Sequence, residues 1–399
     1  MRVLIAHNFY QQPGGEDMVA ANERALLEGA GHEVIFHDIH NDQITGFSAK
    51  LNAFLDTPYS ARQAARFNRL LSETEPDLVH IHNYFPLFTP AIFHEAKACG
   101  FPVVHTLHNF RMMCLSSFLL RDGKICEACI GKTPLKGVVH RCYRGSFSGS
   151  LALARMIARQ RRTGWSQTVD RFIALTEFER AKFIEGGLPA ERLAVKPNFI
   201  PDPGVHARIA PETRHGALFV GRLSPEKGLR TLLDAWRDID YPLRIAGTGP
   251  MMAELHASAS ANVTLLGRLP SSQIYDEMAR AAFLVMPSTW YEGFPVTIVE
   301  SLACGLPILA SRLGSMSELI DPGKTGLLFN PGDSADLVRS VDAALGDAKR
   351  LAAMSRGARQ CYDTNYTAQS NLLRLLQIYQ EARSANAEVV RSGAARNSA

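Results

Sequence analysis

Hydrophobic positions along the chain form short apolar runs that alternate with amphipathic segments of helical period. In the first half, runs of strand type lie at 3–6, 77–82, 103–108 and 169–175. The alternation restarts at Gly216, after a polar stretch at 201–214 that contains prolines. Such alternation is typical of parallel sheets with helices on their faces. The pattern therefore predicts an α/β fold in two successive domains.

Length and composition agree with this picture. A chain of 399 residues is long for a single core, and 46% hydrophobic with 21% charged residues is ordinary for a globular protein. No apolar run is long enough to span a bilayer. The first residues, MRVLIAHNF, are interpreted as a strand rather than a signal peptide, so we expect a cytoplasmic protein.

Polar and glycine residues follow the strands of the first half. Gly14 and Gly15 come after the first strand, where missing side chains would let the backbone approach a ligand, although an ordinary turn is the alternative. Two further strands end in histidine at the carboxyl edge, where ligands bind in open parallel sheets. The candidates are His80, His82, His105 and His108.

Loops after the strands of the second half carry a set of charged residues and glycines. Because loops that follow parallel strands lie on one edge of a sheet, we expect this set to converge on one crevice. Its members are Arg222, Lys227, Gly247, Glu292, Glu300 and Glu318.

The segment 287–307, PSTWYEGFPVTIVESLACGLP, is the most informative part of this half. It predicts a loop and a helix that starts at Pro295, follows a buried strand and stops before Pro307. A helix N-terminus at this place is a site for an anion. Glu292 and Glu300 flank the start, and carboxylates there suit hydroxyl groups on either side of the anion. A sugar–diphosphate–ribose would match this order of groups.

Four cysteines lie in a long insertion at 111–145. Cys114, Cys126, Cys129 and Cys142 have the spacing C-x11-C-x2-C-x12-C, which fits a structural zinc site of four thiolates. A redox pair or four unrelated thiols are the alternatives. A catalytic metal is disfavoured, because four thiolates leave no open position.

The net charge of +4 is mild, but its distribution is uneven. No Asp or Glu occurs from Gly131 to Gly164, and this window contains an apolar–basic helix at 150–162. A solvated helix face is one interpretation, and an anionic membrane surface or a phosphate-bearing partner is the other. The basic residues are Lys132, Lys136, Arg141, Arg144, Arg155, Arg159, Arg161 and Arg162.

Three motifs together resemble those of one enzyme family. The stretch from Glu292 to Glu300 resembles the E-x7-E motif of retaining, family 4 type glycosyltransferases with the GT-B fold. The segment Gly221–Gly228 is similar to their phosphate-binding loop, and VKPNFIP resembles their interdomain junction, with Phe199 in place of the usual glycine. The cysteine-rich insertion departs from the family's core pattern.

The resemblance implies two Rossmann-like, doubly wound domains that face each other across a cleft. Residues 1–200 would form the acceptor domain, including the insertion, and 201–366 the nucleotide-sugar domain. A helix at 367–385 would cross back onto the first domain, and 386–399 would be a disordered tail.

The resemblance also assigns roles to individual residues. Arg222 and Lys227 would stabilise the leaving diphosphate in place of a divalent metal, Glu292 would hold sugar hydroxyls, and His108 would lie beside the donor sugar. Glu300 would accept the ribose hydroxyls. The remaining donor-binding residues would be Gly14, Gly15, Gly221, Gly247, Gly293, Phe294, Pro295, Val296 and Thr297.

The expected activity is transfer of a hexose from a UDP- or GDP-sugar to a saccharide or lipid-linked acceptor, with no cofactor for catalysis. Alternatives on the same scaffold are a nucleotide-sugar epimerase or a synthase with a soluble acceptor. A non-catalytic sugar-nucleotide-binding subunit would need a broken site, and the motif residues are all present. A zinc-dependent nucleic-acid binder has little support, because aromatic residues are sparse in the basic window.

Overall fold

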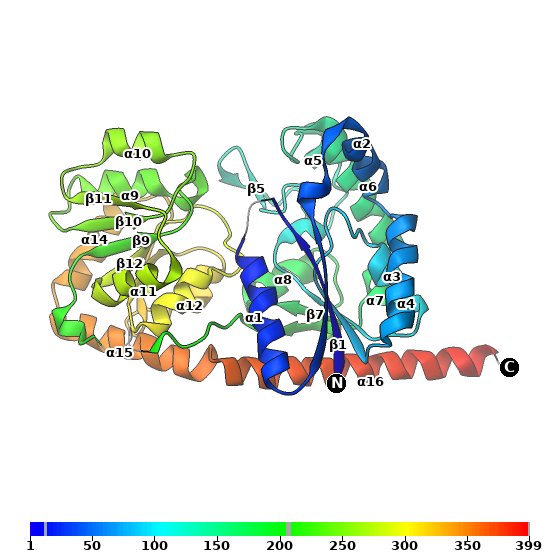
Figure 1. Ribbon diagram of the computed structural model, residues 1–399. Coiled ribbons are helices and arrows are strands. Elements are labelled where there is room, and N and C mark those ends of the chain that lie inside the picture. The colour runs from blue at the N-terminus through cyan, green and yellow to red at the C-terminus, as the bar shows by residue number, and fades with distance from the viewer. Residues whose placement is uncertain (12–13, 205–208, 398–399) are drawn as a thin grey trace. The chain divides into compact units, whose positions relative to one another are not determined.

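The structure, a computed structural model, describes residues 1–11, 14–204 and 209–397 (Figure 1). It divides into two compact units. The first comprises Met1–Leu119, Glu127–Pro197 and the chain from Asn371 onward; the second comprises Leu120–Cys126 and Asn198–Ser370. The change of unit at Pro197 lies close to the boundary expected at residue 200.

The first unit is built on a six-stranded parallel sheet with the order β2-β1-β3-β4-β7-β8. Its strands are β1 (Arg2–Phe9), β2 (Glu33–His40), β3 (Leu78–Asn83), β4 (Val103–Thr106), β7 (Arg171–Ala174) and β8 (Leu193–Val195). β3 and β4 are buried along their whole length, as expected for strands covered by helices on both faces.

Helices connect these strands. They are α1 (Gly15–Gly29), α2 (Gly46–Asp56), α3 (Ala61–Thr74), α4 (Ala91–Ala98), α5 (Leu135–Val139), α6 (Phe147–Thr163), α7 (Trp165–Thr168) and α8 (Glu177–Glu185), with short 3-10 turns at Asn41–Gln43, Phe110–Met112 and Ala190–Arg192. The insertion expected at 111–145 contains α5 and a small antiparallel hairpin, β5 (Leu120–Arg121) and β6 (Lys124–Ile125).

The second unit has its own six-stranded parallel sheet, with the order β11-β10-β9-β12-β13-β14. Numbered within the unit this order is 3-2-1-4-5-6, the doubly wound arrangement of nucleotide-binding folds. The strands are β9 (Ala217–Val220), β10 (Leu243–Ala246), β11 (Val263–Gly267), β12 (Phe283–Met286), β13 (Ile308–Ser311) and β14 (Gly326–Phe329).

The helices of this unit cover both faces of its sheet, and a separate apolar cluster fills each side. They are α9 (Leu229–Trp236), α10 (Met252–Ser258), α11 (Ser271–Arg280), α12 (Val296–Ala303), α13 (Ser315–Leu319), α14 (Ser334–Leu345) and α15 (Ala348–Asn365). Short 3-10 turns lie at Pro211–Thr213 and Pro225–Lys227.

The last helix, α16 (Ala368–Asn397), belongs to the first unit from Asn371 onward (Figure 1, red). Its apolar side, including Leu375 and Ile378, packs on core residues of the first sheet. Where the sequence predicted a disordered tail from residue 386, the structure describes helix as far as Asn397. At the start of this stretch, Asn386 is buried and donates a hydrogen bond of 2.7 Å to the carbonyl of Gly100. The last two residues of the predicted tail lie outside the described chain.

Among the described helices, none combines the length and the apolar character that a membrane-spanning helix requires.

Candidate active site

The loops of the second unit diverge where its strand order reverses. β9 and β12 are neighbours, and their connections leave in opposite directions, which is where open α/β sheets bind ligands. The connection after β9 carries Arg222 and Lys227, and the connection after β12 carries Glu292. Three predicted site residues therefore start from adjacent strands at the same edge.

Backbone hydrogen bonds join these connections into one piece. The amide of Thr289 donates to the carbonyl of Glu226 at 2.9 Å, and the amide of Leu223 donates to the carbonyl of Thr248 at 2.9 Å. The loops after β9, β10 and β12 are thus held together before any ligand arrives. Such preorganisation is what electrostatic stabilisation of a transition state requires.

Two glycines permit this close approach. A side chain at Gly228 would place its Cβ atom 1.8 Å from the carbonyl oxygen of Pro287, and one at Gly247 would come equally close, at 1.8 Å, to the carbonyl oxygen of Gly221. Gly228 also has a φ of +71°. Packing of backbone on backbone accounts for both glycines, and donor binding by Gly221 and Gly247 stays a prediction.

Lys227 and Glu292 form the central ion pair of this edge. The ammonium lies 2.7 Å from one carboxylate oxygen and 3.0 Å from the other, and the hydroxyl of Ser288 donates to the first oxygen at 2.6 Å. The carboxylate is buried, with 6% of its side chain exposed, while 20% of the Lys227 side chain is exposed. Each group therefore orients the other, and both keep hydrogen-bonding capacity for a ligand.

Arg222 contributes a second positive charge at this edge. Its side chain is exposed, and the ion pairs found among the described residues do not include it. An exposed guanidinium at the end of β9 is available for an incoming phosphate, because it presents five donors in a planar fork.

The helix α12 presents its N-terminus after this loop. Pro295 is the N-cap rather than the first helical residue that the sequence predicted, because its ψ of 100° is extended. Among the described residues no side chain caps this end. The first amides, those of Val296 and Thr297, therefore point out of the helix with the positive end of its dipole, where an anion would bind.

Glu300 lies on α12 and is partly buried. Burial raises the pKa of this carboxyl to about 7, so both protonation states are accessible near neutral pH. Gly293 and Phe294 stand between the two acidic residues, and the Phe294 ring lies 6.3 Å from that of Tyr366. The second unit thus contains the whole predicted donor set except Gly14 and Gly15. The α13 residue Glu318, which the sequence placed at the same crevice, is exposed.

In the first unit, Gly14 is the N-cap of α1 and Gly15 is its first residue. The amide of Gly14 donates to Asp17 at 2.8 Å, and the other oxygen of Asp17 contacts Nε2 of buried His7 at 2.7 Å. A Cβ atom at Gly14 would have no neighbour within 4 Å. Packing therefore does not demand glycine at this position, which favours a role in leaving room for a ligand.

The four candidate histidines separate into two groups. His105 donates from Nδ1 to the Ile81 carbonyl and packs among aromatic rings such as Phe93, so it is a core residue. His80 and His82 lie on the opposite face of the sheet, two residues apart on β3, and His82 Nδ1 lies 3.0 Å from His108 Nε2. The sequence pattern did not decide which histidines share a face of the sheet, and the structure shows which ones do.

A charged pair that the sequence did not reveal lies behind His82. Glu23 on α1 and Lys196 after β8 are both completely buried and form an ion pair of 2.6 Å. Burial opposes ionisation of Glu23, but the Lys196 ammonium and nearby histidines outweigh it and hold its pKa well below the usual range. Lys196 also donates to Asn371 of α16 at 3.2 Å.

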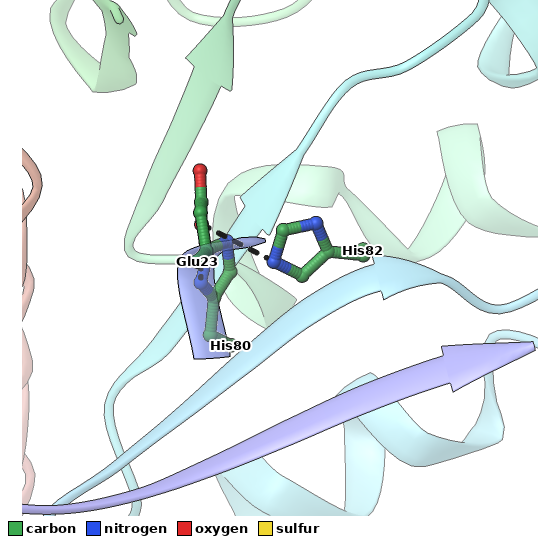
Figure 2. A group of neighbouring side chains, drawn as sticks. All are labelled: Glu23, His80 and His82. Carbon is green, nitrogen blue, oxygen red and sulfur yellow. Dashed lines mark ion pairs between the residues drawn. The ribbon is translucent and has the colours of Figure 1, made fainter. Parts of the chain in front are cut away.

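Glu23, His80 and His82 have ligand atoms within 4.8 Å of one another, and Figure 2 shows both histidines turned toward the carboxylate. The surroundings of this group do not suit a divalent cation. The Lys196 ammonium already neutralises Glu23, and His80 Nδ1 is engaged with the hydroxyl of Tyr379 at 2.8 Å. A fixed ammonium beside the carboxylate would repel a cation, so these residues form a hydrogen-bond network and do not fit a metal.

Glu16 is a further ionisable residue that the sequence gave no signal for. It lies in the first turn of α1, is partly buried, and interacts with Arg111 and Asn109. Burial raises its pKa to about 8.

The four cysteines of the insertion divide between the two units: Cys126 belongs to the second unit, and Cys114, Cys129 and Cys142 belong to the first. Cys114 is buried, whereas Cys126, Cys129 and Cys142 are partly exposed, and all are free of disulfides. The structural zinc stays a prediction.

Comparison with known proteins identifies the family. Residues 18–198 match the profile of the "Glycosyl transferase 4-like domain" and residues 207–361 match that of "Glycosyl transferases group 1". The chain is 27% identical over 306 residues to a D-inositol 3-phosphate glycosyltransferase of Pseudarthrobacter chlorophenolicus, covering 70% of this chain and 65% of the relative. It is 28% identical over 256 residues to a GDP-mannose-dependent alpha-(1-6)-phosphatidylinositol monomannoside mannosyltransferase of Mycolicibacterium smegmatis, covering 56% and 66%. The chain spans less than two thirds of the length of each of these curated relatives.

Solved structures agree in fold. The sucrose-phosphate synthase of Thermosynechococcus elongatus superposes with a TM-score of 0.69 at 17% identity over 96% of this chain and 99% of that one. Anabaena HepE, solved in complex with UDP, gives 0.64 at 19% identity over 98% and 100%. The predicted GT-B fold is thereby confirmed, and with the two family profiles matching in succession along the sequence, the chain belongs to the group 1 glycosyltransferases.

Proposed function

We infer that the protein is a retaining hexosyltransferase that moves a sugar from a UDP- or GDP-sugar to a saccharide or lipid-linked acceptor in polysaccharide or glycolipid synthesis. The observation that carries this proposal is the joined set of loops that holds Lys227 and Glu292 beside the uncapped start of α12. The GDP-mannose-dependent relative and the UDP complex of HepE support a nucleotide-sugar donor.

The arrangement suits the difficult step of sugar transfer, which is departure of a nucleoside diphosphate from the anomeric carbon. Negative charge grows on the leaving phosphate, and fixed positive groups lower the barrier. In this proposal Lys227, Arg222 and the first amides of α12 supply that charge, so no divalent metal is required. Ser288 and Glu292 keep the Lys227 ammonium in place.

The hydroxyl-binding roles fall to the two carboxylates. Glu300 accepts the ribose hydroxyls, and Glu292 with the amides of Gly293 and Phe294 holds hydroxyls of the sugar. His108 of the first unit is assigned to the donor sugar through the family resemblance. Retention then proceeds by attack from the leaving-group face, with the departing phosphate taking the acceptor proton.

The donor assignment is tested by transfer and binding assays with a panel of UDP- and GDP-hexoses. Lys227→Ala or Glu292→Ala should lower transfer at least roughly 100-fold, which is about 2.7 kcal/mol of transition-state stabilisation. Arg230→Ala is the matched control, because Arg230 pairs with the exposed Glu254 instead. Near-normal turnover in either variant would refute the assignment of that residue to the donor site. Anomeric analysis of the product by NMR tests retention.

The acceptor side has a surface suited to anionic lipid. Three large apolar side chains of α5 and the start of α6 are exposed: Leu135 by 63%, Val139 by 74% and Phe147 by 55%. Exposed basic residues lie near them in the sequence, within an acid-free window, including Lys136 and Arg141. Exposed apolar side chains together with cations match the surface of a bilayer with anionic headgroups. We therefore propose peripheral binding to the inner face of the membrane and a lipid-linked acceptor.

Two of the basic residues in this window make contacts within the protein and are therefore less suitable for testing membrane binding. Arg159 stacks over Tyr59 at 4.7 Å and Arg161 donates to the carbonyl of Lys132, so both are engaged within the protein. Lys136→Glu with Arg141→Glu should abolish cosedimentation with phosphatidylglycerol vesicles at low salt, whereas Lys349→Glu, at an exposed lysine of the second unit, should not. Equal binding by all three proteins, or no binding by the wild type, would exclude the membrane.

A further inference from the structure

His82 connects a buried carboxylate to His108. Its Nδ1 atom lies 3.0 Å from His108 Nε2, and its Nε2 atom lies 3.3 Å from the nearer oxygen of Glu23. The ring planes of His82 and His108 differ by 22°, with centroids 5.2 Å apart. A centroid separation this much larger than the nitrogen separation means that the two rings meet edge to edge, as a hydrogen bond requires.

Glu23, at one end of the series Glu23–His82–His108, determines which ring nitrogen of His82 carries the proton. Glu23 is held as a carboxylate by Lys196, and an ionised carboxylate can only accept hydrogen bonds. Among the described residues, the Glu23 oxygen and the His82 nitrogen that face each other at 3.3 Å are both buried, and neither has a hydrogen-bond partner of full geometry. An unprotonated His82 Nε2 would set a lone pair against this oxygen in a site without water access. The proton of His82 therefore belongs on Nε2.

The position of the proton on His82 determines the direction of the hydrogen bond between His82 and His108. With its proton on Nε2, His82 presents an unprotonated Nδ1, which accepts a hydrogen bond. His108 Nε2 must then be the donor. A doubly protonated His82 would instead donate from Nδ1 to His108 Nε2. It would, however, add a second cation beside one carboxylate that Lys196 already neutralises. Burial also lowers the pKa of His108 well below its ordinary value, which keeps that ring neutral.

We propose that Glu23 and His82 are positioning residues that fix His108 as the neutral tautomer protonated at Nε2, leaving Nδ1 as a hydrogen-bond acceptor for a hydroxyl of the transferred sugar. This rests on the proposed function for the identity of that ligand, but the tautomer itself does not depend on it. Among the described residues, Nδ1 of His108 has no hydrogen-bond partner, and the residue is partly exposed. The site therefore selects a sugar that offers a hydroxyl donor at this point.

The direct test is ¹⁵N NMR of the full-length protein labelled at histidine. Protonated and unprotonated imidazole nitrogens are well separated in ¹⁵N chemical shift, and the His108→Asn variant assigns the signals. We expect protonated Nε2 and unprotonated Nδ1 at His108 in the wild type. The His82→Leu variant should lose this preference and show both tautomers. Tyr379→Phe is the control, because it removes the other histidine contact, to His80, and should leave His108 unchanged.

Kinetics provide the second readout. Since one neutral hydrogen bond would be lost, His82→Leu should lower kcat/KM about tenfold, with thermal stability measured alongside Tyr379→Phe to separate positioning from folding. Protonation at Nδ1 in the wild type, or an unchanged tautomer in His82→Leu, overturns the inference. Undiminished transfer by His108→Asn overturns the proposed role of His108 instead, so the two failures are distinguishable. If His82→Leu does not fold, the wild-type spectrum alone decides the tautomer.

Discussion

The ion pair between Lys227 and Glu292 makes a quantitative prediction through a double-mutant cycle. If both residues act independently in the reaction, Lys227→Met and Glu292→Gln together should lower kcat/KM by roughly 10⁴, about 5.4 kcal/mol, because each alone removes about 2.7 kcal/mol. The structure argues against independence, since two contacts of 2.7 Å and 3.0 Å join the same pair of groups.

We therefore expect strong coupling. Once Lys227 is lost, Ser288 is the one hydrogen-bond partner that the carboxylate keeps among the described residues. The carboxylate is then no longer correctly placed, so the second substitution removes little more. The double variant should lie within about tenfold of the weaker single variant, which corresponds to a coupling of more than about 1.4 kcal/mol.

The same cycle applies to folding. The carboxylate is nearly buried while the lysine is partly exposed, so each single substitution should lower the free energy of unfolding by about 1–3 kcal/mol, less than for a fully buried pair. The assays are steady-state transfer and urea denaturation of all four proteins. The control cycle uses Arg230→Met and Glu254→Gln, an exposed pair, and should show normal transfer. Additive losses near 10⁴ in transfer would refute the view that the pair acts as one unit.

Three further predictions concern single residues. Gly228→Ala should lower the free energy of unfolding by more than about 2 kcal/mol in urea denaturation, because its Cβ would overlap the Pro287 carbonyl at 1.8 Å; a loss of only a few tenths would contradict the packing argument. Because burial raises the pKa of Glu300 from 4.5 to about 7, the folded state retains a proton that the unfolded chain releases, so the stability contributed by Glu300 falls between these pH values. Glu300→Gln should accordingly gain stability relative to the wild type as the pH rises through this window, and a constant difference would exclude the effect. Lys196→Met should destabilise by about 3–5 kcal/mol because it leaves Glu23 charged and unpaired, and the added change Glu23→Gln should restore much of the melting temperature; no recovery would show that packing rather than charge dominates.

Local pattern was sufficient for the fold and for the donor loops. The alternation of strands and helices follows from side-chain period, and the loops after β9 and β12 share an edge because the strands are parallel. The start of α12 was misplaced by one residue only, since Pro295 favours both the cap and the first turn.

Long-range pairing could not be predicted from the sequence. Glu23 and Lys196 are 173 residues apart, and each alone looks like an ordinary surface charge. The end of α16 was missed for the same reason, because Asn386 is held by Gly100, 286 residues away. The cysteine spacing suggested a metal site, but spacing does not determine where the sulfur atoms lie in three dimensions.

The return of α16 to the first unit affects the order in which the protein can assemble on the ribosome. Its residues Leu375, Ile378 and Tyr379 complete the core on which Val3 and Ile5 pack. Roughly 170 residues of the second unit are synthesised in between, which takes roughly 10 to 35 s at about 5–20 residues per second. During this interval the main segment of the second unit, Asn198–Ser370, can fold as one continuous stretch, while the first unit must wait with part of its apolar surface uncovered. The N-terminal half, although made first, is therefore the half that completes last, and it is the one that nascent-chain chaperones would protect.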